Sequence, residues 1–430
     1  MPISTDRVIR RVSTRTVSED YPTKVGPLDG VDLGFAGQST QHSTHALHPY
    51  VAAINPPLAR AIIETYVPKD RIVLDPFVGG GAVLLEAMLS GRAGVGFDVN
   101  PLAVMLSKAK TTRLSARVLK RAINAAVSSV PETSDTTRMP LLAKPSSIDL
   151  SAVPELVRFW YRDENARDLL VLRDSIKANA TGEEKWALRT ALSATARDSM
   201  LTYRGEVRLR RLTGRDLERF EADTLLLFRK RADLLLDRIP VLPDGCPQTI
   251  ESGDVMTMDG RVAEGSCHSV VCSPPYADDK NGVGYFQFSR NMLYWVGLSL
   301  EDVAKAKSKF LGADVCAREM PPSKTLELCL ESVRERSQRH YLEGLAFYAD
   351  YYKAIRQMLR AVQHRVIIVI GNRVLARTFF DTARITVEFA LDLGATFEHY
   401  YSRNIRKKRI PNLGGDGGGG EVEHIIVLRK

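Results

Sequence analysis

Residues 273–276, with the sequence Ser-Pro-Pro-Tyr, carry the groups needed to hold a planar aromatic amine. They follow the apolar run 269–272, which predicts that they stand at the end of a buried strand. Each proline fixes φ and removes a backbone N–H, so the turn is rigid and its carbonyl groups point outward as acceptors. The Ser273 hydroxyl and the Pro274 carbonyl can accept two amine protons, and Tyr276 offers a ring face for stacking. The same residues also fit an ordinary strand-ending turn, so a second motif must decide. The candidate catalytic residues are Ser273, Pro274, Pro275 and Tyr276.

A glycine-rich turn lies upstream, between an apolar strand that begins at Arg71 and a predicted helix at 82–90. Its glycines, at positions 79–81, let the backbone approach a ligand where a Cβ would clash. A second predicted strand, 94–98, ends at Asp98, about 20 residues beyond the turn, where an acid accepts hydrogen bonds from ribose hydroxyls. Asp75 ends the first strand and is suited to face an ammonium group. The pattern is not G-x-G-x-x-G, and it favours a nucleoside cofactor that carries an amino acid.

Taken with the Ser-Pro-Pro-Tyr segment, these motifs closely resemble the S-adenosylmethionine-dependent amino-methyltransferases of DNA, in particular the S-P-P-Y group that methylates the N4 amine of cytosine. The resemblance covers residues 45–112 and 250–430. It implies that 75–81 bind the methionine part of the cofactor, 98–103 the ribose and 253–254 the adenine. One departure is Gly80-Gly81-Ala82 where Gly-Ser-Gly-Thr is commoner, a small-for-small change. The cofactor residues that the resemblance implies are Tyr50, Asp75, Pro76, Phe77, Gly79, Gly81, Asp98, Val99, Asn100, Asp254 and Ser273.

The succession of predicted strands and helices indicates an α/β fold with a doubly wound sheet. The resemblance implies a mostly parallel, seven-stranded, Rossmann-like methyltransferase sheet. We expect an arm of little regular structure at 1–44, a catalytic domain formed by 45–112 and 246–430, and a helical insertion at 113–245 that is a candidate DNA-recognition subdomain. The polar, Gly-bearing segment 277–290 is a candidate lid. Further predicted elements are helices at 58–66, 293–300, 326–336, 341–362 and 382–393, strands at 248–251 and 365–370, and a hairpin of 396–405 with 421–428.

The reaction that the resemblance implies is direct attack of a base amine on the sulfonium methyl, with the base flipped out of the duplex. Ring-carbon methylation in its familiar enzymes uses a Cys after Pro, and none of the 21 prolines here is followed by Cys. We interpret Cys272 as a buried strand residue rather than a nucleophile. Methylation of adenine N6 or of an RNA base amine stays open, because the clamp formed by residues 273–276 suits any exocyclic amine. A nucleic-acid-binding subunit with a decayed site is the alternative from another class.

Composition sets the wider frame. The chain has 430 residues, 44% hydrophobic and 26% charged, which is typical of a globular protein with a full core. Five cysteines without metal-site spacing indicate no zinc site and no disulfide framework, and we expect no metal, no membrane span and a cytoplasmic, nucleoid-associated place in a bacterium or archaeon. A net charge of +9 favours a polyanionic partner, here double-stranded DNA. We expect a monomer or homodimer, and any restriction endonuclease partner would be a separate chain.

Two basic segments are candidates for contact with DNA phosphates. Residues 203–212 alternate Arg with apolar residues, so an extended chain would present Arg on one face; a solvated edge strand is the alternative. Residues 403–409 form a basic stretch before the Gly-rich loop 414–420. The candidate DNA-binding residues are Arg204, Arg208, Arg210, Arg211, Arg406, Lys407, Lys408 and Arg409.

Overall fold

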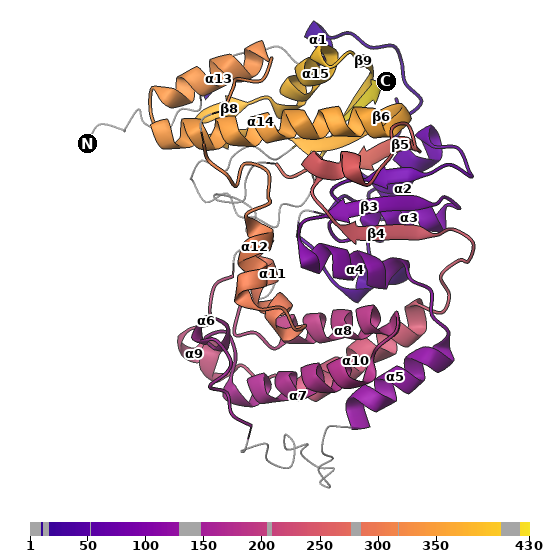
Figure 1. Ribbon diagram of the computed structural model, residues 1–430, viewed down its shortest axis with the longest axis vertical. Helices are drawn as coiled ribbons and strands as arrows, with labels where there is room; N and C mark the ends of the chain where they lie inside the picture. The colour runs from indigo at the N-terminus through magenta and orange to yellow at the C-terminus, as the bar shows by residue number, and fades with distance from the viewer. Residues whose placement is uncertain are drawn as a thin grey trace.

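The computed structural model describes residues 10–11, 17–51, 53–128, 148–203, 209–276, 285–316, 318–405 and 422–430. A sheet with helices on both faces forms the upper part of the molecule in Figure 1, and a group of helices forms the lower part. No helix among the described residues is long and apolar enough to cross a membrane.

The central sheet has seven strands in the order β4-β3-β2-β5-β6-β10-β9. The first five are parallel to their neighbours, whereas β10 is antiparallel to both β6 and β9. The chain runs outward from β2 in one direction and from β5 in the other, so the sheet is doubly wound. The predicted mostly parallel, Rossmann-like methyltransferase sheet is therefore confirmed. The strands are β2 (Val73–Asp75), β3 (Gly94–Asp98), β4 (Gln248–Ser252), β5 (Cys267–Cys272), β6 (Val362–Gly371), β9 (Thr396–Asn404) and β10 (Val422–Arg429).

Strand residues alternate between two buried cores because successive side chains point to opposite faces of a sheet. Val270 and Ile368 pack in the core beneath α13 (Lys324–Arg334), α14 (Gln338–Ala361) and α15 (Thr382–Asp392). Val271 and Ile367 pack in the core on the other face, which α2 (Pro56–Tyr66) and α3 (Ala82–Leu89) cover. The sheet is thus covered on both faces, and the edge where the parallel strands end is left for a site.

The local sequence explains how three helices of this domain begin, of which α4 was not predicted. The Asn55 side chain accepts a hydrogen bond from the Leu58 N–H and proline opens α2, since its missing donor costs nothing in the first turn. Asn100 caps α4 (Pro101–Thr111) in the same way. Gly81 precedes α3 with a φ of 80°, a left-handed conformation that glycine adopts without strain.

Helices α5 to α10 lie between β3 and β4 in the sequence, and all of them except α9 contribute buried residues to a separate core. Apolar residues recur at helical spacing over 217–235, but the chain leaves the helix at Arg219, and α10 begins where the Asp223 side chain accepts a hydrogen bond from the Leu226 N–H. The apolar period continues across this break, but the Asp223 side chain caps the start of a new helix there. The bounds are α5 (Ala116–Ser128), α6 (Glu155–Arg158), α7 (Asp163–Asn179), α8 (Glu184–Asp198), α9 (Gly214–Glu218) and α10 (Thr224–Arg238).

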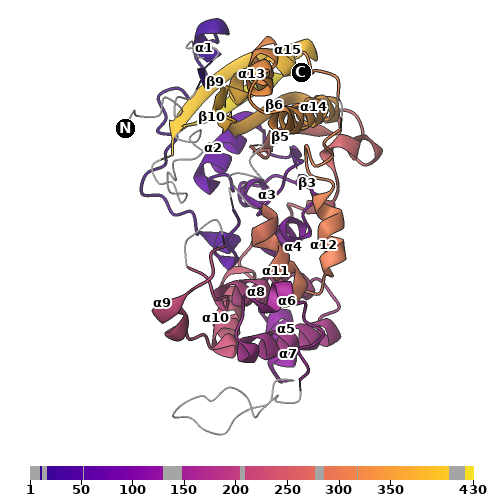
Figure 2. The ribbon, with the colours of Figure 1, turned by 90° about the vertical axis from the view of Figure 1, so that its left-hand side faces the viewer.

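Helices α11 (Tyr285–Trp295) and α12 (Leu300–Lys307) stand between the two parts of the molecule, as both views show (Figures 1 and 2). They pack on α4, and Trp295 is buried in the core of the insertion. The predicted helix at 293–300 is wrong at its centre, because Gly297 with a φ of 100° breaks the chain between α11 and α12. The candidate lid 277–290 is also corrected, since 285–290 are helical; 277–284 lie outside the described residues.

The described part of the N-terminal arm packs against the central sheet and its helices. Val17, Leu28 and Leu33 are buried, and Asp20 forms an ion pair with Arg384. A small second sheet joins β1 to β8 and β7. The remaining elements are β1 (Arg10–Arg11), α1 (Val17–Asp20), η2 (Ser43–Leu47), η3 (Val255–Gly260), β7 (Arg373–Leu375) and β8 (Thr378–Phe380).

Candidate active site

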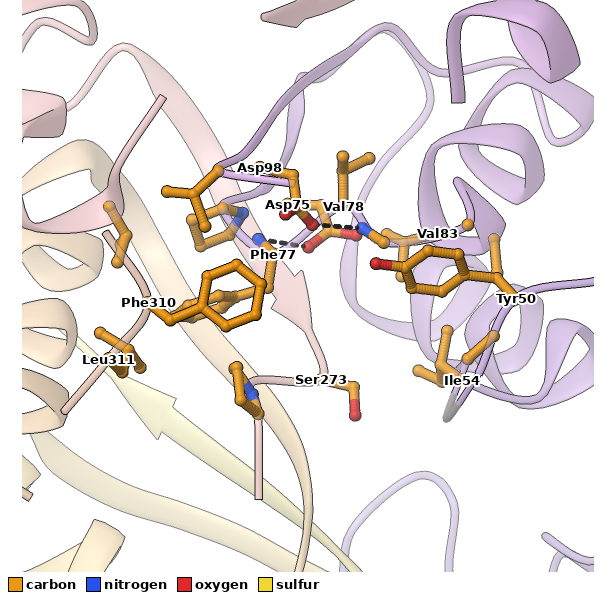
Figure 3. A pocket seen from close by; sticks show the side chains of 18 of the residues that line it. Tyr50, Ile54, Asp75, Phe77, Val78, Val83, Asp98, Ser273, Phe310 and Leu311 are labelled. Atoms are coloured by element: carbon orange, nitrogen blue, oxygen red, sulfur yellow. Dashed lines mark hydrogen bonds between the residues drawn. The ribbon is translucent and has the colours of Figure 1, made fainter. Parts of the chain in front are cut away.

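A cleft opens at the carboxyl ends of β2, β3 and β5. This is the point where the strand order reverses, which is where ligands bind in open α/β sheets. In Figure 3, Phe310 and Leu311 lie on one side of the cleft, Tyr50 and Ile54 on the other, and Ser273 between them. Of the predicted cofactor residues, those that line the cleft are Tyr50, Asp75, Pro76, Phe77, Gly79, Asp98, Val99, Asp254 and Ser273.

Asp75 is the most buried acid of the cleft, with 2% of its surface exposed. Its Oδ1 accepts a hydrogen bond of 3.1 Å from the Phe77 N–H. Burial raises the pKa of Asp75 to about 8, against the effect of that hydrogen bond, and the charge of Asp98 raises it further. A cation that enters the cleft would favour the charged carboxylate and reverse part of this shift.

Asp98 connects the glycine-rich turn to the end of β3. Its two carboxylate oxygens accept hydrogen bonds from the N–H groups of Gly79, at 2.9 Å, and Asn100, at 2.8 Å. Burial raises its pKa to about 6, and the bonds from Asn100 and Gly79 oppose the rise. The Val99 N–H is a third donor to this carboxylate, which leaves lone-pair capacity for a ligand hydroxyl.

Two predicted cofactor residues do not line the cleft. The Asn100 amide donates to the hydroxyl oxygens of Tyr50, at 3.1 Å, and Ser289, at 2.9 Å, and its own oxygen caps α4. Asn100 therefore orients Tyr50, which does line the cleft. Gly81 sits behind the turn, where an added Cβ would lie 2.9 Å from the Ser107 backbone. Asn100 therefore affects the cleft by holding Tyr50 in place, and Gly81 affects it by leaving room for Ser107 behind the glycine-rich turn.

The other end of the cleft is built from segments far apart in the sequence. Asp254 lines it, and the Asp254 side chain also accepts a hydrogen bond from the Met256 N–H; burial raises the Asp254 pKa. Opposite stand Lys309, Phe310 and Leu311, from the segment after α12. Sequence reasoning missed these three, and a Phe-Leu pair in a polar segment was the only available signal.

Lys110 is a second residue that the sequence did not single out. It is buried, with 4% of its surface exposed, and its Nζ donates to the carbonyl groups of His48 and Gly80, both at 3.0 Å. Burial lowers its pKa to about 8. The ammonium therefore holds the Gly80 carbonyl from behind the cleft.

The clamp residues stand at the end of β5, as the sequence predicts. Ser273 and Pro275 line the cleft, whereas Pro274 and Tyr276 are not among its lining residues. The Tyr276 hydroxyl lies 3.2 Å from Ser273 Oγ and donates to Glu423 Oε1 at 3.3 Å. The Tyr276 ring rests on Gly371, where a Cβ would be 3.1 Å from the ring.

Cys272 is fully buried in β5 beside Met358. Burial raises the pKa of its thiol well above the usual range, and the nearby Asp75 charge adds to the rise. A neutral, enclosed thiol is a poor nucleophile, which agrees with the interpretation of Cys272 as a strand residue.

The predicted DNA-binding arginines are only partly described. Arg210 is exposed and its guanidinium lies 4.2 Å from the centre of the Tyr203 ring. Arg211 lies 4.6 Å from the centre of the Phe159 ring and donates to the Phe159 carbonyl at 2.8 Å, so it is held within the fold. Arg403 is also held, by Glu423. The other candidates, Arg204, Arg208, Arg406, Lys407, Lys408 and Arg409, lie outside the described residues.

One group of side chains in the described part of the chain could hold a metal ion, namely His42, His45 and Glu86. Both imidazoles, however, contact the same carboxylate oxygen, at 2.6 and 2.7 Å, and Arg60 donates to the other oxygen at 2.7 Å. The fully buried carboxylate thus has partners already, and the cluster fastens the start of η2 to α3.

Comparisons with known proteins agree with this geometry. A family model described as DNA methylase, for the N6 and N4 enzymes, matches residues 29–109. Type II methyltransferase M.MvaI of Kocuria varians is 28% identical over 405 residues, which cover 88% of each chain. Type II methyltransferase M.MjaII of Methanocaldococcus jannaschii is 26% identical over 106 residues, 24% of this chain and 20% of that one.

Among solved structures, the rRNA methyltransferase aviRa from Streptomyces viridochromogenes aligns with a TM-score of 0.30 at 12% identity, over 95% of this chain and 96% of that one. The family model and the two Type II relatives confirm the predicted resemblance to the DNA amino-methyltransferases. The choice of cytosine N4 stays a prediction.

Proposed function

We propose that this chain, an S-adenosylmethionine-dependent DNA methyltransferase of the N6/N4 family, transfers its methyl group to the N4 amine of cytosine. The observation that carries the proposal is the continuity of one cleft, which runs from Asp75 and Asp98 to Ser273. The residues proposed to bind the cofactor and the turn proposed to hold the amine therefore line one cleft. A nucleic-acid-binding subunit with a decayed site would not need this arrangement.

The cleft suits the cofactor residue by residue. The buried Asp75 carboxyl has a single hydrogen-bond donor among the contacts described and would pair with the amino-acid ammonium. Asp98 has lone pairs left for the ribose hydroxyls, and Phe310 offers a flat apolar face near Asp254 for the adenine. When bound, the cofactor supplies an electrophilic methyl group on a sulfonium.

At the clamp, the chain must hold an amine whose lone pair is delocalised into its ring. Ser273 Oγ and the Pro274 carbonyl would accept the two N–H protons and favour a pyramidal nitrogen. Alignment of the amine with the methyl would provide much of the rate, since well-oriented reactants lower a barrier by about 7–11 kcal/mol. The S-P-P-Y resemblance favours cytosine over adenine.

The target base must leave the duplex to reach Ser273, at a cost of a few kcal/mol. We propose that Tyr276 offsets part of this cost by stacking, and that the Arg-rich segment 204–210 holds DNA phosphates. The family model and the Type II relative support DNA as the substrate, and we propose that this DNA is double-stranded.

The test is methylation of mixed-sequence DNA with labelled cofactor, followed by digestion and nucleoside analysis. We expect N4-methylcytosine, with neither 5-methylcytosine nor N6-methyladenine above background. The Ser273→Ala variant should bind the cofactor as the natural protein does but transfer methyl groups about a hundredfold more slowly.

N6-methyladenine as the main product would overturn the choice of cytosine. Methylation of RNA alone would overturn the choice of DNA. A protein that binds the cofactor and modifies neither would be the decayed subunit.

A further inference from the structure

A line of hydrogen-bonding side chains leads away from the clamp to a partly buried ion pair. Ser273 Oγ is 3.2 Å from Tyr276 Oη, which lies 3.3 Å from Glu423 Oε1. Arg403 then donates to Glu423 Oε2 through Nε at 2.7 Å and through a second guanidinium nitrogen at 2.5 Å. The side chains of Glu423 and Arg403 are only 12% and 10% exposed.

The sheet fixes this line in place. Glu423 of β10 is paired in register with Gly371 of β6 on one side and with Arg403 of β9 on the other. The Tyr276 ring packs on Gly371, which has no Cβ to displace it. Three neighbouring strands therefore bring the Tyr276 hydroxyl and the Glu423 carboxylate together.

The ion pair sets the direction of every hydrogen bond in the line. A carboxylate paired with a guanidinium carries no proton, so it can only accept, and Tyr276 must donate to it. The Tyr276 oxygen is then left to accept the Ser273 hydroxyl proton. Ser273 Oγ in turn has only lone pairs to offer, which is the polarity required to hold an amine N–H.

Methyl transfer to an amine leaves a proton that must go somewhere. As the nitrogen–carbon bond forms and the carbon–sulfur bond breaks, its electron pair goes to sulfur, and the nitrogen becomes positively charged with its protons still attached. A serine hydroxyl cannot keep an added proton unless it gives up its own. The amine therefore needs an acceptor beyond Ser273.

We propose that Glu423 is that acceptor, reached through Ser273 and Tyr276, with Arg403 as a positioning residue for its carboxylate; this rests on the proposed function. One proton passes from the amine to Ser273 Oγ, the Ser273 proton passes to Tyr276 Oη, and the Tyr276 proton passes to Glu423 Oε1. The nitrogen and the carboxylate become neutral, while both hydroxyls are restored. The two O–O distances are 3.2 and 3.3 Å, and catalytic hydrogen bonds shorten when the substrate is bound.

The test compares single-turnover methyl transfer in two variants that break the line at different points. Glu423→Gln keeps the shape of the side chain but removes the proton acceptor, and Tyr276→Phe keeps the ring but removes the linking hydroxyl. Each should slow methyl transfer about tenfold to a hundredfold, with cofactor and DNA dissociation constants changed by less than about threefold. Glu423→Asp should recover part of the rate.

Two comparisons separate a relay from a structural role. The double variant, Tyr276→Phe with Glu423→Gln, should be no slower than Tyr276→Phe alone, because losses of rate at two residues of one relay are not additive. Glu398→Gln is the matched control, since Glu398 of β9 forms a similar partly buried pair with Arg365, at 2.6 and 2.9 Å, away from the clamp. It should leave the methylation rate unchanged.

A natural protein that methylates no base amine would defeat the proposed function itself. If the natural protein is active and Tyr276→Phe keeps its full rate, the relay is wrong and the proposed function stands. Additive losses in the double variant would equally overturn the relay. Should Glu423→Gln fail to fold, Tyr276→Phe still decides, because it leaves the Arg403 ion pair intact.

Discussion

At the scale of single residues, the two acids of the cleft behave differently from solvent-exposed carboxylates. The pKa of Asp75 is raised to about 8 and that of Asp98 to about 6, both chiefly by burial. Near neutral pH, Asp75 therefore keeps its proton in the absence of a cation, and a cationic ligand would displace that proton. Cofactor binding and protonation are therefore linked.

This linkage predicts how the stability of the cofactor-free protein depends on pH. Because the folded pKa of Asp75 lies above its unfolded value, the unfolded chain loses the proton first, and stability falls as pH rises from about 4 to 8. Asp75→Asn removes this loss, which amounts to at most about 1.4 kcal/mol per pH unit. Urea unfolding at pH 5, 6.5 and 8 should show the variant gaining on the natural protein as pH rises.

The same Asp75→Asn variant should bind the cofactor more weakly, so greater stability and poorer binding go together. Asp168→Asn is the control, because Asp168 is a buried acid of α7 that does not line the cleft. It should not alter cofactor affinity. A stability difference between Asp75→Asn and the natural protein that stays constant across pH would contradict the raised pKa.

Residues close to a strand end were predictable from sequence, and residues brought in by register were not. Asp75, Asp98 and Ser273 each follow an apolar run, and a parallel sheet places the ends of such runs at one edge. Glu423 is 147 residues from Tyr276 and reaches it only through the pairing of β10 with β6. No local pattern specifies that pairing, so the acceptor of the proposed relay was out of reach.

At the scale of elements, the segment after α12 closes the cleft from the side of the insertion. It contributes Phe310, whose ring faces the cleft in Figure 3. Its position depends on α11 and α12, which pack on α4. The sequence did not predict this because Gly297 divides what looked like one helix, and the direction of α12 depends on that break.

We expect Phe310→Ala to weaken cofactor binding about tenfold, because an aromatic contact contributes roughly 0.5–1.5 kcal/mol beyond the area it buries. Calorimetry on the free protein measures the change in affinity. Phe159→Ala is the matched control, since Phe159 is 52% exposed and packs beside Arg211 in the insertion. Equal affinity in Phe310→Ala and the natural protein would place the adenine elsewhere.

At the scale of the whole molecule, positively charged side chains that have partners within the fold must be distinguished from those available to bind DNA. Two arginines of the basic segments have partners within the fold, Arg211 at Phe159 and Arg403 at Glu423. The net charge calculated from the sequence overestimates the charge available to a partner, because the sequence alone does not show which charged side chains are already paired within the fold.

We expect the salt dependence of DNA binding to separate the two classes. Replacing Arg204, Arg208 and Arg210 together by Gln should lower the slope of log K against log salt by about 0.9 for each phosphate that the variant no longer neutralises. Arg211→Gln should leave the slope unchanged and reduce thermal stability. A triple variant with an unchanged slope would show that this segment does not touch DNA.

The reversed strand β10 also imposes an order on assembly. Strand β9 is synthesised before β10 but, within the described residues, pairs with β10 alone, and β6 also leaves one edge uncovered until β10 arrives. The simplest order is for β9 and β10 to form their hairpin first, with the Arg403–Glu423 pair across it, and then to dock as a unit on β6. A nascent chain in which β2 to β6 have been synthesised already contains Asp75, Asp98 and the clamp. In the proposed relay, the acceptor Glu423 is therefore the last part of the site to be synthesised.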